Sequence, residues 1–495
     1  MSVGHAVAIA ALLPVLAYRI VGWIVRIWSK QLWDYGSAQD AWSAYQLVIG
    51  RTPYPDFRNP PYFPNNRPPV SLYLASVVSK IFERTPMGTL EAGRLVTICA
   101  TMGVCGFIFL LARRYNASYG AALLGAFMFA LSPLLEPFGF EFRADMLALA
   151  FELAGLYLFS RDVECGAVAA FSAAFFTKQN QIAGIAAVAL FCWLGAKPRR
   201  AVKLVAVWLL SVVFGVFALQ LIFPYYLLNC FGGLTGWYDA AAPLEFLWLT
   251  GEYNFAIFAL AAVGLMRALR GKELSACFFL TALSQDLISC LRWGSNVYYY
   301  LPALAAAAIL AAEAVDLLLR YPRGKLNKCL AATALTLALF FQLRVSDVPR
   351  TQSGLTYMMS SLAALSRGSM PCCFSQRAPA WDPEALRHLN QLRGTIATDD
   401  PYLLLEPDNR QIMFLEFLLL SPLHAHKLFD DRPLLREIAE RKIAAFVLIN
   451  AIRYRNHDLF WPELRRTMAA NYHMVRGIGP PYIMIPDTTS SNGHH

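Results

Sequence analysis

The chain has 495 residues, of which 57% are hydrophobic and only 15% are charged, and its mean hydropathy is +0.43. Soluble domains carry about 25% charged residues, so this composition excludes a disordered chain and an ordinary soluble enzyme. The net charge of +10 does not require nucleic acid, because a polytopic membrane protein keeps lysines and arginines on its cytoplasmic side. The ten cysteines are mostly isolated in apolar segments, without the spacing of a zinc site or a disulfide framework.

Apolar segments recur along the chain with lengths that suit a hydrocarbon core of about 30 Å. They cover residues 4–27, 90–112, 118–135, 146–160, 165–177, 182–196, 201–223, 253–268, 274–291, 298–319 and 328–345. With a cytoplasmic N-terminus, the loops rich in lysine and arginine all fall on the cytoplasmic side, as the positive-inside rule requires. The sequence therefore predicts a polytopic α-helical membrane protein with about 11 transmembrane helices. The first of them is expected to be an anchor and not a cleaved signal peptide.

Two segments between the predicted spans are expected to lie outside the membrane. Residues 28–89 form a proline-rich first outer loop, which contains an amphipathic helix over 34–49 and an apolar stretch over 70–82 that is too short to cross. Both are expected to lie flat on the outer leaflet. Residues 224–251 are rich in aromatic residues and glycine, which predicts an interfacial loop.

The end of the chain returns to a soluble pattern after the transmembrane domain, residues 1–345. Alternating strands and helices predict a small C-terminal extracytoplasmic α/β domain over 346–487, followed by a disordered tail over 488–495. The expected elements are strands at 395–398, 443–450 and 482–485, and helices at 433–442 and 461–471.

Charged and amide side chains gather in the outer loops, at the ends of the predicted spans. They are Asp34 after the first span, the turn Glu141-Phe142-Arg143-Ala144-Asp145, the break Lys178-Gln179-Asn180-Gln181, and Arg292-Trp293-Gly294-Ser295-Asn296 before Tyr298. Charge near a membrane is costly, which makes these residues functional candidates. A carboxylate that takes a proton from a hydroxyl, beside cations that hold a departing phosphate, suits glycosyl transfer. Nucleotide sugars remain in the cytoplasm, so an outward-facing set implies a lipid-borne donor.

At these residues the sequence resembles the GT-C glycosyltransferases, the clan of protein O-mannosyltransferases and lipid A aminoarabinose transferases that use polyprenyl-phosphate sugars. The resemblance covers the whole membrane part and rests on the order and sidedness of short motifs. They are Asp34-Tyr35-Gly36, Gly50-Arg51-Thr52-Pro53-Tyr54-Pro55-Asp56-Phe57, Asn66-Arg67-Pro68-Pro69, Arg143-Ala144-Asp145, Lys178-Gln179 and Gly294-Ser295-Asn296-Val297-Tyr298. The C-terminal segment resembles the outer α/β domains of bacterial members.

This resemblance implies an inverting hexosyl or pentosyl transferase of the bacterial inner membrane, with a cytoplasmic N-terminus and a periplasmic C-terminal domain. Asp34 would act as general base toward the acceptor hydroxyl, and the donor phosphate would be held by cations of the outer loops, namely Arg143, Lys178 and Arg292. Further substrate contacts are expected from Asp40, Tyr54, Asp145, Gln179, Asn296 and Tyr298. The implied partners are a polyprenyl-phosphate sugar, membrane lipids and an acceptor glycan, lipid or protein, with no nucleic acid.

The acids of the first outer loop argue against a metal cofactor. Metal-dependent relatives have paired acids, whereas here Tyr35 follows Asp34 and the next acid, Asp40, comes six positions later. A separation of six positions places two carboxylates on different faces of a helix. No metal or other cofactor is therefore expected.

The candidates also have plainer interpretations. Asp34 would be the N-cap of a helix, Asp40 a solvated helix residue, and Arg143 and Asp145 an ion pair without a substrate role. Lys178 would extend to the membrane interface, as lysines at span ends commonly do.

The alternative function is a transporter or flippase of a lipid-linked or small anionic substrate. A transporter is expected to have paired hydropathy halves, broken helices and ionisable residues inside its spans. The acids inside the predicted spans are scattered; they are Glu152, Asp286, Glu313 and Asp316.

Overall fold

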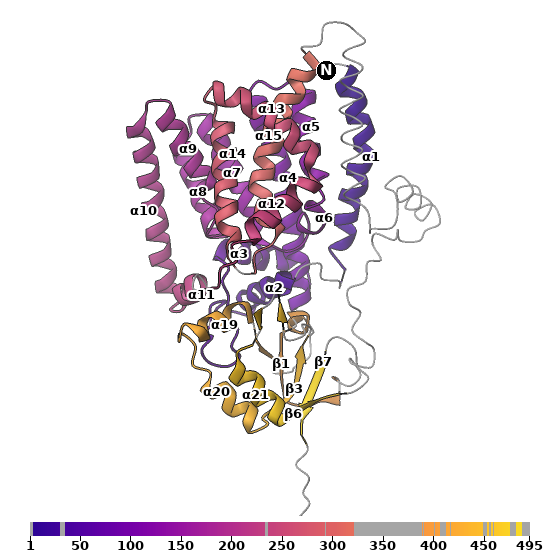
Figure 1. Ribbon diagram of the computed structural model, residues 1–495, viewed down its shortest axis with the longest axis vertical. Helices are drawn as coiled ribbons and strands as arrows, with labels where there is room; N and C mark the ends of the chain where they lie inside the picture. Colours follow the sequence, from indigo (N-terminus) through magenta and orange to yellow (C-terminus); the bar gives the residue numbers. More distant parts are fainter. Residues whose placement is uncertain are drawn as a thin grey trace, which may run out of the picture.

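Long helices lie side by side in one layer, and a smaller unit with strands lies beyond one end of them (Figure 1). Helix α2 (Tyr35–Val48) lies between the two. The computed structural model describes residues 3–29, 35–232, 236–292, 294–320, 389, 391–399, 401–405, 412–415, 417–448, 453–454, 457–458, 460–475 and 482–487.

Ten of the eleven predicted spans coincide with helices of the structure. These helices are α1 (Val3–Arg26), α4 (Pro86–Arg114), α5 (Tyr119–Ala130), α7 (Ala144–Ser160), α8 (Glu164–Thr177), α9 (Ala183–Leu194), α10 (Pro198–Ile222), α13 (Phe255–Arg270), α14 (Leu274–Cys290) and α15 (Leu301–Arg320). The last predicted span, 328–345, lies outside the described residues. The count of eleven therefore stays a prediction.

Among the described residues, four helices are long and apolar enough to cross a membrane by themselves. They are Ala8–Arg26, Pro86–Arg114, Pro198–Ile222 and Val297–Leu318. A fifth span results if α12 (Ala242–Tyr253) and α13 are taken together, although the chain bends by 97° between them. The remaining apolar helices have 10–17 residues, at or below the lower end of the length that spans a hydrocarbon core.

Local sequence explains where the longest helix begins and ends. Thr85 caps α4 by accepting a hydrogen bond from the Gly88 N–H at 3.0 Å, and Pro86 supplies the fixed φ that suits a first helical position. Arg113 and Arg114 occupy the last turn, where positive charge is favourable next to the unsatisfied carbonyls.

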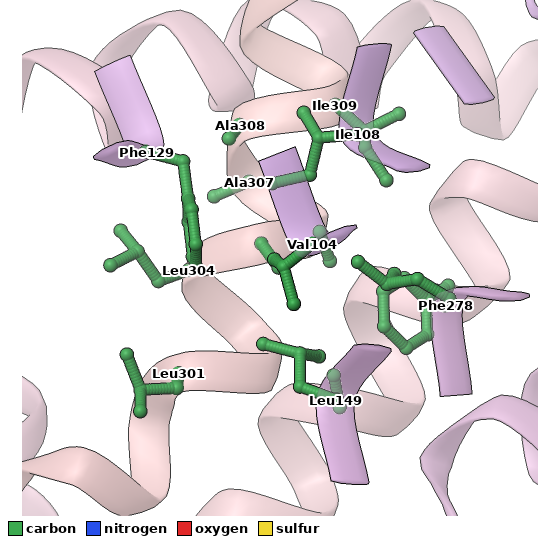
Figure 2. Close-up of a cluster of buried hydrophobic side chains, with 14 of the residues drawn as sticks. Val104, Ile108, Phe129, Leu149, Phe278, Leu301, Leu304, Ala307, Ala308 and Ile309 are labelled. Atoms are coloured by element: carbon green, nitrogen blue, oxygen red, sulfur yellow. The ribbon is translucent and has the colours of Figure 1, made fainter. Parts of the chain in front are cut away.

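Helix α15 forms the centre of the bundle because its small residues allow neighbouring helices to approach closely. All residues from Leu301 to Asp316 are buried, and half of them are alanines. A Cβ atom added at Gly125 of α5 would lie 2.8 Å from the Ala312 Cβ, and one at Gly264 of α13 would lie 2.2 Å from the Leu310 carbonyl oxygen. Close approach through small residues is a common way for membrane helices to pack. Figure 2 shows larger side chains from α4, α5, α7 and α14 that fill the space beside α15.

The prediction that helix 34–49 lies flat on the outer leaflet is wrong. Helix α2 is buried on several faces, because Ala38, Ala41 and Ala44 on one face and Gln39 and Ser43 on others are all buried. It packs against α4, α3 (Pro69–Val78) and the short helix η5 (Pro401–Leu405). Small side chains allow contact on opposite sides at once, so α2 is enclosed by the protein and does not rest on lipid.

Helix α3 has an exposed apolar face, and the place of segment 70–82 on the outer leaflet stays a prediction. Tyr73, Val77 and Ile81 project from α3 and the turn η1 (Ser79–Ile81) that follows it. In contrast, the predicted interfacial loop 224–251 contains two short helices, α11 (Tyr226–Gly232) and α12. Pro243 lies in the first turn of α12, and its carbonyl accepts a hydrogen bond from the Tyr300 hydroxyl at 2.6 Å.

The C-terminal region contains a five-stranded mixed sheet with the order β2-β1-β3-β7-β6. Strands β1 (Thr395–Thr398), β2 (Ile412–Phe414) and β3 (Ile443–Leu448) are parallel, whereas β7 (Tyr482–Pro486) and β6 (Tyr472–Met474) join them in antiparallel pairs. Helices α19 (Phe417–Ala425), α20 (Arg432–Ala439) and α21 (Pro462–Asn471) accompany the sheet. Three strands and two helices were predicted, while β2 and β6 were missed because three residues are too few to show a period. That this unit is extracytoplasmic stays a prediction, and the tail 488–495 lies outside the described residues.

The first loop is built into this C-terminal unit. Phe57 and Tyr62 are buried in the same apolar cluster as Phe429, Leu434 and Trp461. The Pro61 carbonyl accepts a hydrogen bond from the Phe414 N–H at 3.1 Å, at the end of β2. The path of the first loop, and of the residues that follow it, is therefore fixed partly by a segment more than 300 positions later.

Replacing Phe57 with alanine is expected to destabilise this contact by about 3–5 kcal/mol, because a fully buried aromatic ring is removed and a cavity remains. Limited proteolysis in detergent should then cut the C-terminal region faster than in the wild type. The matched control is Tyr73→Ala in α3 of the same loop, since the Tyr73 ring is 62% exposed. Equal cleavage rates for the two variants would contradict the buried contact.

Candidate functional site

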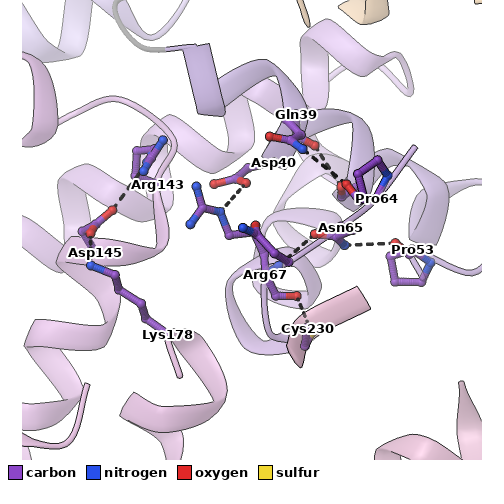
Figure 3. Close-up of polar contacts among 12 residues, drawn as sticks. Gln39, Asp40, Pro53, Pro64, Asn65, Arg67, Arg143, Asp145, Lys178 and Cys230 are labelled. Atoms are coloured by element: carbon purple, nitrogen blue, oxygen red, sulfur yellow. Dashed lines mark hydrogen bonds and ion pairs between the residues drawn. The ribbon is translucent and has the colours of Figure 1, made fainter. Parts of the chain in front are cut away.

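Three residues predicted from two outer loops form one buried ion cluster. Asp145 lies in the first turn of α7, where one carboxylate oxygen is 2.5 Å from the Lys178 Nζ atom. The other carboxylate oxygen is 3.4 Å from the Arg143 Nε atom. All three side chains are buried. Asp145 therefore joins the turn before α7 to the break between α8 and α9 (Figure 3).

A second ion pair faces this cluster, and sequence reasoning missed its basic member. The Arg67 Nε atom lies 2.9 Å from an Asp40 carboxylate oxygen. Figure 3 shows this pair next to Arg143 and Asp145. Burial lowers the pKa of Arg67, but the negative charge of Asp40 outweighs this effect and keeps the pKa above its ordinary value. Arg67 is therefore always charged. The motif Asn66-Arg67-Pro68-Pro69 was the available signal, although it gave no reason to choose Arg67.

Two tyrosines line the cationic side of the cluster. The Tyr298 and Tyr299 rings stack with centroids 4.9 Å apart. The Arg143 guanidinium lies 4.5 Å from the Tyr298 centroid, and the Lys178 Nζ lies 4.3 Å from the Tyr299 centroid. Ring faces attract cations, so both tyrosines help to hold the positive groups in place. Tyr298 is buried beside Phe138 and is not part of an exposed aromatic belt.

Tyr54 and Gln179, which were predicted to contact substrate, hold the backbone next to Arg67. The Tyr54 hydroxyl donates to the Arg67 carbonyl at 2.8 Å, and the Gln179 amide donates to the Asn66 carbonyl at 3.1 Å. Burial raises the pKa of Tyr54 well above its ordinary value, so its hydroxyl stays protonated and can donate. Asn229 of α11 accepts the Asn65 N–H at 2.8 Å. The Asn65–Arg67 segment is thus fixed from several sides.

The remaining predicted residues lie in different settings. Asn296 is exposed and caps the short helix η3 (Val297–Tyr300) by accepting the Val297 N–H at 2.7 Å. Arg292 is partly buried at the end of α14, where its backbone pairs with Tyr238. The structure brings its side chain into no ion pair or ring contact with the described members of the cluster. Asp34 lies outside the described residues.

The structure overturns two of the plainer interpretations. Asp40 is only 2% exposed and is paired with Arg67, so it is not a solvated helix residue. Lys178 does not extend to the interface, because Asp145 and the tyrosine rings hold it inside the protein. The simple pair of Arg143 with Asp145 exists, but Lys178 shares the same carboxylate.

Two further buried acids lie inside helices, Glu152 in α7 and Asp286 in α14. Glu152 accepts hydrogen bonds from the Gly184 N–H at 2.6 Å and from the Gln181 amide. Asp286 accepts the Ala303 N–H at 3.0 Å. These contacts satisfy N–H groups at the starts of α9 and α15, which gives both buried carboxylates a structural role.

The balance of charge in the cluster favours an anionic ligand. Among the described residues that meet here, three are cations, namely Arg67, Arg143 and Lys178, and two are carboxylates, namely Asp40 and Asp145. The set therefore carries one net positive charge in a place with little water, where electrostatic interactions are strong. Within the described part of the chain, no three histidine, cysteine or acidic side chains gather in a way that could hold a metal ion.

Comparison with known proteins finds a family match over part of the chain and a similar fold over nearly all of it. Residues 66–226 match the family described as dolichyl-phosphate-mannose-protein mannosyltransferase, and this stretch contains all three cations of the cluster. The chain is similar to the crystal structure of ArnT from Cupriavidus metallidurans in the apo state, with a TM-score of 0.60 and 14% identity over 99% of this chain and 100% of that chain. It is also similar to ArnT from the same organism bound to undecaprenyl phosphate, with a TM-score of 0.58 and 14% identity over 98% and 100% of the two chains. No curated protein matches the sequence.

Proposed function

We propose that this chain is a membrane glycosyltransferase of the GT-C type, which transfers a sugar from a polyprenyl-phosphate donor to an acceptor hydroxyl; the family match over residues 66–226 and the fold it shares with ArnT support this. The observation that carries the proposal is the buried cluster with one excess positive charge, built from the first loop, the turn before α7 and the break after α8. A phosphate monoester or diester is an anion that such a cluster would bind. One structural relative holds undecaprenyl phosphate, which favours a donor of the same class here.

The proposed reaction is a single displacement. Asp34 takes the proton of the acceptor hydroxyl, the hydroxyl oxygen forms a bond to the anomeric carbon, and the bond from that carbon to the phosphate oxygen breaks. Polyprenyl phosphate leaves, and one displacement inverts the anomeric configuration. Arg67, Arg143 and Lys178 stabilise the negative charge that grows on the phosphate as it departs.

The ion pairs of the cluster have a direct consequence for this step. Asp145 and Asp40 hold the cations in place before the donor arrives, so little rearrangement is needed when charge develops. Arg292 is proposed as a further cation at the edge of the donor site. Asn296 and the tyrosines would border the sugar.

The proposal places the protein in the bacterial inner membrane, with its N-terminus in the cytoplasm. Residues 1–345 would form the transferase domain, with the first loop 28–89 in the periplasm. The sheet-containing region within 346–487 would lie in the periplasm as well, where it contacts that loop. The acceptor would be a glycan, lipid or protein of the cell envelope.

A transporter or flippase is the second candidate. The 97° bend between α12 and α13 and the acids buried within helices, Glu152 and Asp286, are features that a transporter is expected to have. The two candidates differ in covalent chemistry, because a transporter moves its substrate without breaking the sugar–phosphate bond.

Proteoliposomes of the purified protein separate these functions. They would be supplied with undecaprenyl-phosphate hexoses and pentoses labelled in the sugar, together with a cell-envelope lipid and glycan fraction as acceptor. We expect one polyprenyl phosphate to be released for each labelled sugar that enters a new glycoside. Movement of intact donor between leaflets, with no release of polyprenyl phosphate, would favour the transporter.

A further inference from the structure

One arginine outside the cluster contacts the two segments that supply most of it. Arg94 lies on α4, and neither it nor its partner Glu141 has any exposed side-chain surface. The Arg94 Nε and Nη2 atoms each donate to a Glu141 oxygen at 3.2 Å, so the two groups meet in a bidentate pair. A planar guanidinium in this arrangement fixes orientation as well as distance.

The other side of the same guanidinium holds the end of α1. The Arg94 Nη1 atom donates to the carbonyls of Arg26 at 3.1 Å and Ile27 at 3.3 Å, and also to the Ser29 carbonyl. The last carbonyls of a helix have no partner within the helix and carry partial negative charge. Arg94 supplies hydrogen-bond donors and the opposite charge to these carbonyls, although it belongs to another helix; the Arg26 carbonyl also accepts the Ser29 N–H at 3.1 Å.

These contacts lead directly to the cluster along the chain. Glu141 precedes Arg143 by two positions and Asp145 by four. Its neighbour Phe142 packs on Gly93, where an added Cβ would lie 2.1 Å from the ring. The backbone beyond Ser29 continues into the first loop, which carries the Arg67–Asp40 pair. Arg94 therefore connects the start of that loop with the turn that bears Arg143 and Asp145.

We propose that Arg94, through Glu141, is a positioning residue for the transfer reaction: it sets the relative place of the first loop and of the turn 141–145, so that Arg67 and Arg143 face the same donor phosphate. This inference rests on the proposed function. A buried ion pair is not needed for stability alone, since apolar side chains of similar volume commonly replace such pairs without loss of stability. Its directional contacts would instead be needed for the geometry of the site.

Three variants test the inference, and each is measured on the fraction of protein that is folded and monodisperse. Glu141→Gln keeps the side-chain shape and removes the negative charge. Arg94→Lys keeps the positive charge and removes the bidentate contact of the guanidinium. The double variant R94M/E141M removes both charges. The matched control is Glu136→Gln, because Glu136 also binds the end of α1, through Arg26 at 2.7 Å, but lies outside the turn 141–145. Readouts are kcat and KM for transfer and the dissociation constant of undecaprenyl phosphate.

We expect the double variant to fold and to lose about 100-fold in kcat/KM, since a displacement of about 1 Å in a site can cost that much. Its dissociation constant for undecaprenyl phosphate should rise about tenfold or more, and Arg94→Lys should fall between it and the wild type. The control should match the wild type.

A folded double variant with wild-type kinetics and binding would overturn the inference. If none of the three variants folds, the pair is a determinant of folding, and the positioning role is likewise overturned. A wild-type protein that neither binds undecaprenyl phosphate nor transfers sugar would instead remove the proposed function.

Discussion

Replacement of Lys178 by methionine is expected to lower kcat for sugar transfer by about 10²- to 10³-fold, the usual cost of losing one group that stabilises charge in a transition state. Methionine has a similar length and no branch, so it fills the same space without the charge. Lys178 is held 2.5 Å from Asp145 and beside the Tyr299 ring, which places its ammonium where a departing phosphate would be bound. The measurement is the initial rate of polyprenyl phosphate release in proteoliposomes.

The single variant alone does not separate catalysis from stability, because Lys178 belongs to a buried ion pair. Loss of one partner of such a pair costs about 3–5 kcal/mol. The double variant K178M/D145N removes one positive and one negative charge, so the cluster keeps its net charge of one. We expect the double variant to recover most of the thermal stability that the single variant loses, while its activity stays low.

The matched control for this experiment is Lys80→Met, a lysine of the first loop that is exposed to solvent. Its rate should equal that of the wild type. If K178M/D145N turned over at the wild-type rate, Lys178 would serve only the structure, and the donor phosphate would need another cation.

Local patterns were sufficient to predict most of the helices. A run of apolar residues specifies a membrane helix by itself, so α4 and α10 follow from the sequence with little reference to their neighbours. The rule that charge near a membrane is costly also identified Arg143, Asp145 and Lys178 as candidate site residues at the ends of spans. These residues stand out because their own surroundings in the sequence are apolar.

Residues whose role depends on distant contacts were missed. Arg67 lies in a proline-rich loop whose path is set by Asn229 and by the C-terminal sheet, and neither is visible from the loop sequence. Arg94 has its acidic partner 47 positions away. The enclosure of α2 likewise depends on which helices meet its alanines, since an amphipathic pattern does not distinguish a lipid surface from a protein surface.

The second large effect is expected at Asp34, the proposed general base. Asp34→Asn should reduce kcat by about 10²- to 10⁴-fold, because the amide cannot accept the proton of the acceptor hydroxyl. The phosphate-binding cations are unchanged in this variant, so the dissociation constant of undecaprenyl phosphate and the KM for the donor should stay near the wild-type values. A loss confined to kcat distinguishes a base from a residue that binds the donor.

Two other acids of the first loop provide the comparison. Asp56 pairs with the exposed Arg58 at 2.7 Å, and Asp56→Asn should leave both kcat and KM unchanged. Asp40→Asn should raise the donor KM more than it lowers kcat, because Asp40 orients Arg67 and does not reach the acceptor in this proposal. Labelling of single cysteines placed on either side of Asp34 should report exposure to the periplasm. Undiminished transfer by Asp34→Asn, or a cytoplasmic location of these cysteines, would remove Asp34 as the base, since the base and the lipid-linked donor must share one side of the membrane.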